Sequence, residues 1–410
     1  MAETKLEKGS ESASRRKFLS MGAALGGALT ACSDSGEPVP EEGPKRLGRA
    51  PNEYGERSPF EKAVRRGAVA KHPETGSTRT PLQDSHGIIT PSSLHFERHH
   101  AGVPVIDPAK HRLLIHGLVE RPLVLTLEEL KTLPSVSRVH FVECAGNGRL
   151  EWSDKKGPTA QDSHGLASCS EWTGVLLSLL LEEAGVKPEA TWLVAEGADA
   201  CKMQRSLPLD KCRDDVIVAY GQNGEAIRPD QGYPLRLVVP GFEGNINVKW
   251  VRRLMLTDQA AMARDETSKY TDLLANGKAR IFSFPMEAKS VITRPSGGQA
   301  LTGPGFHEIS GLAWSGRGLI ERVEISTDNG ATWRDAELQE PRHRIAFTRF
   351  RAPWTWDGAE IVILSRATDE TGYVQPTEQA LLDVRGPNSD YHNNCIKAWK
   401  ISGDGSVTNV

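Results

Sequence analysis

The sequence predicts a turn-rich, mostly β protein in which strands mixed with helices are followed by a β-sandwich. The chain has 410 residues, including 39 glycines, and is 38% hydrophobic. That composition is typical of a globular, turn-rich protein, and the length is sufficient for two domains and a large core. From about Phe282 onward, short segments that alternate apolar and polar residues are separated by turns. This spacing indicates an immunoglobulin-like sandwich.

Local signals place the other elements in order along the chain. Thr126, followed three residues later by Glu129, forms a capping box and predicts a short helix. A leucine-rich stretch over residues 176–185 predicts a buried helix that Gly185 ends. Further patterns predict strands and hairpin turns: strands over 113–119, 192–195, 216–220, 309–314, 320–326 and 360–365, and turns at 223–224 and 328–330.

Charge and cysteine content exclude several classes of protein. A formal net charge of −3 provides no basic field for nucleic acid and no strong attraction to anionic membranes. The six cysteines contain no Cys-x-x-Cys pattern, which argues against an iron–sulfur cluster, a zinc knuckle and covalently attached haem on this chain. The sequence leaves open whether four of them form disulfides, namely Cys169, Cys201, Cys212 and Cys395.

The N-terminal residues predict an export signal. Ser14–Leu19 resembles a twin-arginine motif, and the apolar segment after it is too short to span a membrane. We expect residues 1–35 to direct the protein to the periplasm by the twin-arginine route. Leu29–Cys32 also has the pattern of a lipobox, so Cys32 is a candidate for lipidation. Residues 36–84 are rich in Pro, Gly, Glu and Arg and predict an extended arm or linker.

The stretch Val139–Arg149 is the most informative in the chain. A β-branched, alternating run predicts a strand that delivers Cys144 into a turn made by Gly146, Asn147 and Gly148. A thiol is thereby placed at the end of a rigid element. Its pKa would fall if the guanidinium of Arg149 folded back over it. The alternative is a buried structural cysteine.

The residues Glu-Cys-Ala-Gly-Asn-Gly-Arg at 143–149 resemble the molybdenum-ligand motif of the sulfite oxidase family. Three further blocks resemble that family in the same order, and the likeness covers roughly residues 85–390: these blocks are 93–100, 230–250 and 320–333. The resemblance implies an α+β fold. A mixed α/β molybdopterin domain would occupy residues 85–281, and an immunoglobulin-like dimerisation domain residues 282–388, with a tail over 389–410.

The resemblance also implies a set of cofactor-binding residues. The thiolate of Cys144 would bind molybdenum, and side chains around it would hold the molybdopterin. Arginine and lysine at neighbouring strand ends suit a phosphate group. Glutamine stands where several family members have histidine, and it can donate a hydrogen bond but carries no charge. These residues are His100, Cys144, Asp199, Gln231, Arg236 and Lys249.

A second implied set would line the substrate pocket. Arg98, Arg149 and Arg349 would surround an anionic sulfur group, Trp172 would form an apolar wall, and Tyr270 would lie over the metal. The residues alone leave other interpretations open: a core position for the tryptophan, and surface positions for the tyrosine and for the sandwich arginine. A cage of histidines is disfavoured, because adjacent histidines at 99 and 100 point to opposite faces of a strand.

The family resemblance implies a molybdopterin oxidoreductase that oxidises a sulfur substrate by oxo transfer. Because the sequence has no haem motif, we expect electrons to pass to a separate c-type cytochrome with two haems. The pattern most resembles the sulfane dehydrogenases, which act on sulfur held by a carrier protein. A soluble sulfite dehydrogenase is the near alternative; a molybdopterin-dependent reductase of oxides and a non-catalytic scaffold are more distant ones. A homodimer through the sandwich or a heterotetramer with the cytochrome would follow.

Overall fold

The computed structural model describes residues 50–67, 72, 74–152, 156–274 and 276–410. The predicted export signal and Cys32 lie outside these residues. The chain divides into two compact units, residues 1–61 and 62–410. Residues 50–61 of the first unit contain no helix or strand, and everything below concerns the second unit.

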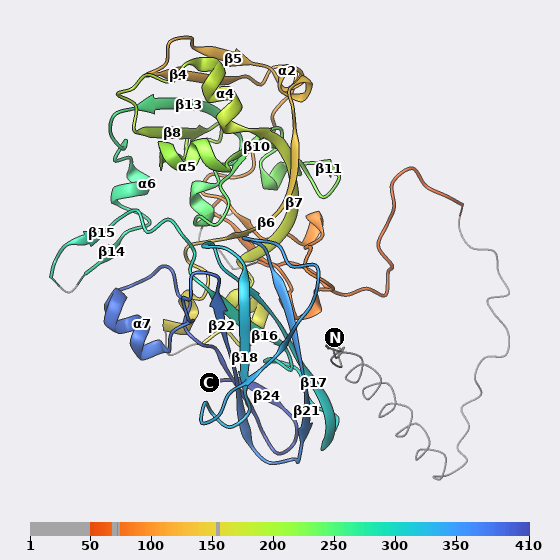
Figure 1. Ribbon diagram of the computed structural model, residues 1–410. Coiled ribbons are helices and arrows are strands. Elements are labelled where there is room, and N and C mark those ends of the chain that lie inside the picture. Colours follow the sequence, from red (N-terminus) through yellow and green to blue (C-terminus); the bar gives the residue numbers. More distant parts are fainter. Residues whose placement is uncertain (1–49, 68–71, 73, 153–155, 275) are drawn as a thin grey trace, which may run out of the picture. The chain divides into compact units, whose positions relative to one another are not determined.

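The first sheet of the N-terminal domain carries the cysteine motif (Figure 1). Its central strand β7 (Ala167–Leu176) lies between β6 (Val136–Glu143) and β10 (Ile217–Gln222), antiparallel to both. Strand β10 also pairs with β11 (Glu225–Ala226) and β12 (Arg236–Val238). Asn223 and Gly224, both at positive φ, close the β10–β11 hairpin, as the sequence predicts.

The second sheet of this domain mixes parallel and antiparallel pairs. Its order is β5-β4-β13-β8-β9, and only β4 and β13 run parallel. Three helices accompany it, and leucine and valine side chains form the buried core around them. The bounds are β4 Leu113–Gly117, β5 Leu123–Leu125, α2 Leu127–Thr132, α4 Leu177–Ala184, β8 Trp192–Gly197, β9 Gln204–Pro208, α5 Leu209–Asp214 and β13 Val251–Thr257.

Shorter elements complete the domain. They form a small three-stranded sheet, a hairpin, and single turns of helix near the cysteine motif. The bounds are β1 Arg66–Gly67, β2 Ser77–Arg79, η1 Leu82–Asp84, η2 Ser92–Leu94, β3 Glu97–Arg98, η3 Arg149–Trp152, α3 Ala160–His164, η4 Pro229–Gln231, η5 Gly244–Ile246, α6 Arg264–Thr267, β14 Asp272–Leu273 and β15 Ala279–Arg280.

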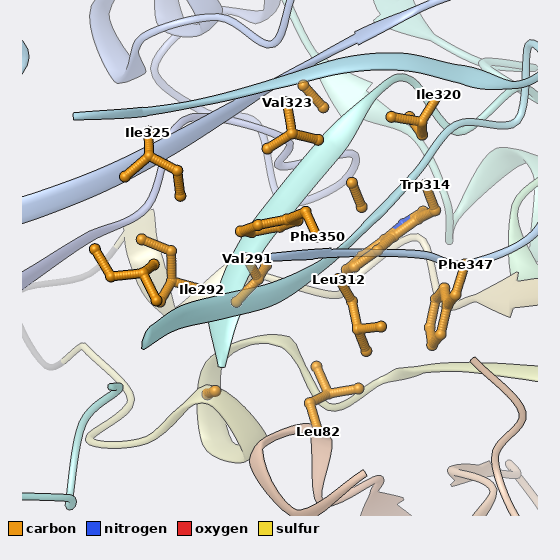
Figure 2. Close-up of a cluster of buried hydrophobic side chains, with 14 of the residues drawn as sticks. Leu82, Val291, Ile292, Leu312, Trp314, Ile320, Val323, Ile325, Phe347 and Phe350 are labelled. Carbon is orange, nitrogen blue, oxygen red and sulfur yellow. The ribbon is translucent and has the colours of Figure 1, made fainter. Parts of the chain in front are cut away.

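Two further sheets form the C-terminal sandwich. Their orders are β16-β17-β21-β20 and β19-β18-β22-β23-β24. Figure 2 shows part of the core between them, where Trp314, Phe350, Val323 and Ile325 are buried. The bounds are β16 Lys289–Arg294, β17 Gly305–Trp314, β18 Ile320–Ser326, β19 Arg334–Asp335, β20 Glu337–Leu338, β21 Thr348–Trp356, β22 Ile361–Asp369, α7 Glu378–Arg385, β23 Ala398–Ile401 and β24 Val407–Asn409. The predicted fold class, a mixed α/β domain followed by a β-sandwich, is confirmed.

Two parts of the chain differ from the local predictions. Strand β7 is not among the predicted strands, because its residues are mostly buried on both faces and its sequence therefore lacks alternation. The polar segment after Gly386 contributes strands β23 and β24, which extend the sandwich from β22. Both differences arise from pairing between distant segments.

No helix in the described part of the chain has both the length and the apolar character needed to cross a membrane.

Loss of the α2 cap should destabilise the protein. The hydroxyl of Thr126 accepts a hydrogen bond from the backbone N–H of Glu129 at 3.1 Å, and the Glu129 carboxylate accepts one from the Thr126 N–H at 2.8 Å. We expect Thr126→Ala to lower the free energy of unfolding by about 0.5–2 kcal/mol, measured by urea denaturation. Thr132→Ala, at the other end of the helix, is the control. An equal loss in both variants would contradict the capping assignment.

Candidate functional site

Cys144 lies where β6 ends and a tight turn begins. Its backbone N–H donates to the carbonyl of Leu166 at 2.9 Å, and its carbonyl accepts from the N–H of Asn147 at 2.8 Å. Gly148 takes a φ of +82°, a conformation that favours glycine. Burial raises the pKa of the Cys144 thiol, while the Gly146 N–H and the charge of Arg98 act against that rise. The effect predicted for Arg149 is absent, because that guanidinium does not fold back over the thiol.

A pocket lies beside Cys144. It has about 670 Å³ of space outside the protein atoms, open solvent at its mouth included. It brings together side chains from β3, β6, η4, β12 and the loops after β8 and η5. Among the lining residues are Arg98, His100, Cys144, Asp199, Gln231, Arg236, Lys249 and Tyr270, all predicted from the sequence.

Two buried cations form one wall of this pocket. Arg236 donates to the carbonyls of Gln231 at 3.0 Å and Asn247 at 3.3 Å, and Lys249 donates to the carbonyl of Asp230 at 2.8 Å. Both backbones pair across an isolated bridge. Burial lowers the pKa of Arg236 to about 9. Burial, followed by the charge of Arg236, lowers the pKa of Lys249 to about 7.

The partners of these two cations are neutral. In the described residues no ion pair joins either cation to a carboxylate. The neighbouring carboxylates are engaged elsewhere: Asp230 pairs with Arg65 at 2.5 Å, and Glu97 lies 3.0 Å from His99. Two adjacent buried positive charges with only carbonyl partners favour an anion in the pocket.

Trp172 supports the arginine from behind. Its ring is fully buried, and the guanidinium of Arg236 lies 4.7 Å from the ring centroid. The indole N–H donates to the carbonyl of His140 at 3.3 Å, and the ring of His95 meets it edge-on. Trp172 therefore does not line the pocket, and it affects the site by holding Arg236 in place.

His100 and Tyr270 contact each other in the lining of the pocket. Their Nε2 and hydroxyl atoms are 2.8 Å apart. Burial lowers the pKa of His100 to about 4, and burial raises the pKa of Tyr270 above its usual value. At neutral pH the tyrosine therefore keeps its proton and the imidazole is neutral, and the tautomer of His100 decides which of the two groups donates the hydrogen bond. The guanidinium of Arg205 lies 5.2 Å from the Tyr270 ring centroid, and the ring of Tyr391 packs against the same ring at a centroid distance of 5.5 Å.

Asp199 and Gln231 are each fixed by the surrounding chain. The thiol of Cys201 donates to Asp199 Oδ2 at 2.7 Å, and the N–H of Met203 donates to Oδ1 at 3.3 Å. The Gln231 amide donates to the carbonyl of Phe96 at 2.9 Å. Both residues line the pocket. Their contact with a cofactor remains a prediction.

Two predicted pocket arginines lie elsewhere. Arg149 is largely exposed and pairs with Asp390 at 3.0 Å. Arg349, on β21, donates to the carbonyls of Ser85 at 3.0 Å and Gly87 at 2.7 Å. Neither side chain lines the pocket, so their predicted contact with substrate has no support in this geometry. The physical reason is that each finds its oxygen partners outside the pocket.

Several lining residues were not predicted as cofactor ligands. His95 Nε2 and Asn245 Oδ1 are buried and have no hydrogen-bond partner within the described residues. Buried polar atoms normally have a partner, so both atoms are free to contact a bound group. Asn245 lies within the 230–250 block. This position was the only signal in the sequence that could have identified it as a lining residue.

The five cysteines in the described residues are all unpaired. They are Cys144, Cys169, Cys201, Cys212 and Cys395.

Comparison with known proteins places the chain in a family. Residues 100–264 match the family model for an oxidoreductase molybdopterin binding domain, and residues 280–399 match that for a Mo-co oxidoreductase dimerisation domain. The crystal structure of the sulfane dehydrogenase SoxCD from Paracoccus pantotrophus superposes with a TM-score of 0.89. It is 47% identical in sequence, with 92% of this chain and 99% of that chain covered.

Curated relatives include longer enzymes. A nitrate reductase [NAD(P)H] from Hordeum vulgare is 32% identical over 375 residues, which span 82% of this chain and 41% of that protein. A mitochondrial sulfite oxidase from Drosophila melanogaster is 33% identical over 339 residues, which span 75% of this chain and 59% of that protein. The chain thus spans about two fifths of the length of the nitrate reductases it matches.

The chain belongs to the sulfite oxidase family of molybdopterin oxidoreductases. Its pocket fits the molybdenum–molybdopterin cofactor that this family implies. The buried cations Arg236 and Lys249 suit the phosphate group, and the partnerless His95 and Asn245 atoms suit a polar ring system. Cys144 supplies a thiol to the pocket, and its binding to the metal remains a prediction.

Removal of a buried cation should empty the site. Loss of one charge-assisted contact costs about 1.5–3 kcal/mol, which corresponds to roughly ten- to 150-fold weaker binding. We therefore expect Lys249→Met to lower the molybdenum content per chain, measured by mass spectrometry of the purified protein. Lys131→Met, at an exposed ion pair with Glu128, is the control. Unchanged molybdenum in Lys249→Met would contradict the anion assignment.

Anion binding to the metal-free protein should depend on pH. Lys249, with a pKa of about 7, is positive below neutral pH and loses its charge above it, whereas Arg236, with a pKa of about 9, stays charged. We expect sulfate affinity, measured by calorimetry, to fall between pH 6 and pH 8. Sulfate keeps a constant charge in this window.

Lys249→Arg provides the control for this titration. Arginine stays protonated throughout the window, so this variant should bind sulfate with a much flatter pH dependence. A wild-type affinity that does not change between pH 6 and pH 8 would show that Lys249 does not control the anion site.

Proposed function

We propose that this protein is a periplasmic molybdenum oxidoreductase that oxidises sulfane sulfur bound to a carrier protein and passes electrons to a c-type cytochrome with two haems. The observation that carries the proposal is the likeness to the sulfane dehydrogenase SoxCD, which extends over 99% of that chain at 47% identity. Likeness of this extent over both domains, together with Cys144 in a cationic pocket, favours related chemistry.

The bound cofactor would supply two-electron transfer of an oxygen atom to sulfur. The residues of this chain would bind, orient and shield it. Arg236 and Lys249 would neutralise its phosphate, and Cys144 would fix the metal at the end of a rigid strand. Arg98 lines the same pocket and would attract an oxyanion formed at the sulfur. The Tyr270 hydroxyl, which is hydrogen-bonded to His100 Nε2, would hold a proton in the pocket.

The cellular setting belongs to the same proposal. The twin-arginine motif supports export to the periplasm, and the sandwich matches a family model described as a dimerisation domain. We expect the protein to form either a homodimer through this domain or a heterotetramer that includes the cytochrome. Mass photometry of the protein purified from its native periplasm would distinguish the two assemblies, because only the heterotetramer carries the added mass of the cytochrome chains.

Sulfite oxidation is the second candidate function. The specific observation in its favour is the 33% identity to a mitochondrial sulfite oxidase. The cationic pocket would accept sulfite as readily as a carrier-bound sulfur oxyanion, since arginine forks bind both.

A steady-state assay separates these candidates. Purified protein is mixed with oxidised cytochrome c and either sulfite, thiosulfate or a persulfidated carrier peptide, and cytochrome reduction is followed by the absorbance of the reduced haem. The proposal expects reduction with the persulfidated peptide at a rate well above that with sulfite. A faster rate with sulfite would favour the second candidate.

Replacement of the ligand thiol should abolish turnover. We expect Cys144→Ser to retain the fold, as judged by circular dichroism, and to lose cytochrome reduction, because the hydroxyl is a poor ligand for a soft metal site. Cys212→Ser, a buried position in α5 outside the pocket, is the control and should lose stability without losing activity. Full activity in Cys144→Ser would refute the ligand assignment.

A further inference from the structure

The carboxylate of Glu143, directly before Cys144, is held by three donors. Lys289 Nζ donates to its Oε1 at 3.0 Å, and Asn147 Nδ2 donates to the same oxygen at 2.8 Å. The indole N–H of Trp314 donates to Oε2 at 2.7 Å. The side chains of Glu143 and Lys289 are each only 1% exposed, so solvent has almost no access to the ion pair.

Two of these donors come from the C-terminal sandwich. Lys289 is the first residue of β16 and Trp314 the last residue of β17, and the two residues are direct cross-strand partners. Trp314 is fully buried within the sandwich core (Figure 2). Side chains at the edge of the C-terminal sandwich therefore hold the end of strand β6 in the N-terminal domain.

Lys289 also lies against the turn that carries the thiol. At Gly148, a Cβ atom would lie 3.3 Å from Lys289 Nζ and 3.2 Å from the carbonyl of Asn393. Asn147, besides donating to Glu143, accepts from the Leu166 N–H at 3.1 Å. The turn is thus packed against the lysine on one side and tied to the neighbouring segment on the other.

The C-terminal tail makes a further contact with this turn. The N–H of His392 donates to the carbonyl of Ala145 at 2.8 Å, and its ring lies 3.2 Å from Glu243. Gly244, next to Glu243, packs against the thiol residue: a Cβ there would lie 3.2 Å from Cys144 Cα. Displacement of the turn in any direction would break one of these contacts.

We propose that Lys289 and Trp314 are positioning residues through which the sandwich fixes the Cys144 turn against the cofactor pocket. The inference rests on the proposed role of Cys144 as the metal ligand. A buried charge that loses its partner destabilises its surroundings, and residues that orient a metal ligand alter metal affinity or activity by about 10- to 100-fold when changed. The sandwich is then part of the catalytic apparatus as well as an assembly domain.

A purely structural role for this network would have different consequences. If the ion pair only joined the two domains, its loss would lower the melting temperature and leave the metal environment unchanged. A positioning role also changes the electron paramagnetic resonance spectrum of the partly reduced metal, because that spectrum responds to the angle and distance of the cysteine sulfur. The spectrum therefore discriminates between the two roles.

The test compares three variants of the holoenzyme. Trp314→Phe removes one N–H and keeps an aromatic ring, and Lys289→Met removes the charge. Trp399→Phe is the matched control, since Trp399 is equally buried in the sandwich and donates its N–H to the carbonyl of Ile292 at 3.0 Å. We expect the first two variants to shift the spectrum and to lose turnover by about tenfold or more, and the control to match the wild-type spectrum.

Wild-type spectra and molybdenum contents in both Trp314→Phe and Lys289→Met would overturn the proposal, whatever their melting temperatures. If Lys289→Met does not fold, Trp314→Phe alone decides the outcome. The double variant Glu143→Gln/Lys289→Met removes both buried charges together and should recover part of the wild-type spectrum; no recovery would refute the charge pairing.

Cys144→Ser separates this inference from the proposed function. A changed spectrum in Cys144→Ser with unchanged spectra in the other variants would refute only the positioning role. An unchanged spectrum in Cys144→Ser would refute the ligand assignment itself, and the positioning role with it.

Discussion

Two positive charges, on Arg236 and Lys249, lie side by side in the interior with backbone carbonyls as their hydrogen-bond partners. Burial depresses the pKa of each, so the protein carries these cations at a cost that an anionic cofactor would offset. Their positions depend on β12, on the bridge between their backbones, and on the Trp172 ring behind the arginine. The arrangement of the pocket depends on keeping these two cations buried and adjacent.

The thiol reaches the same pocket by a different route. Strand β6 ends at Glu143, whose carboxylate is fixed by Lys289 and Trp314, and the next residue is Cys144. A ligand that follows a clamped residue has little freedom to move. The fold thus combines a charged wall from one set of strands with a thiol whose backbone is held by the neighbouring sandwich.

The sequence allowed prediction of the elements whose signals are local. The capping box at Thr126, the glycine stop at Gly185 and the turn after Cys144 depend on residues within a few positions of each other. Strand β7 and the positions of Arg149 and Arg349 could not be predicted in this way, because they are decided by partners far along the chain. The Glu143 network has the same origin, since two of its three donors lie 146 and 171 residues away.

X-ray absorption at the molybdenum edge of the purified protein tests the central claim most directly, because it counts the sulfur atoms around the metal. The account predicts that wild-type protein contains molybdenum with one more sulfur ligand than Cys144→Ser. The same number of sulfur ligands in both proteins, or the absence of molybdenum from wild-type protein produced with its cofactor supply intact, would contradict it.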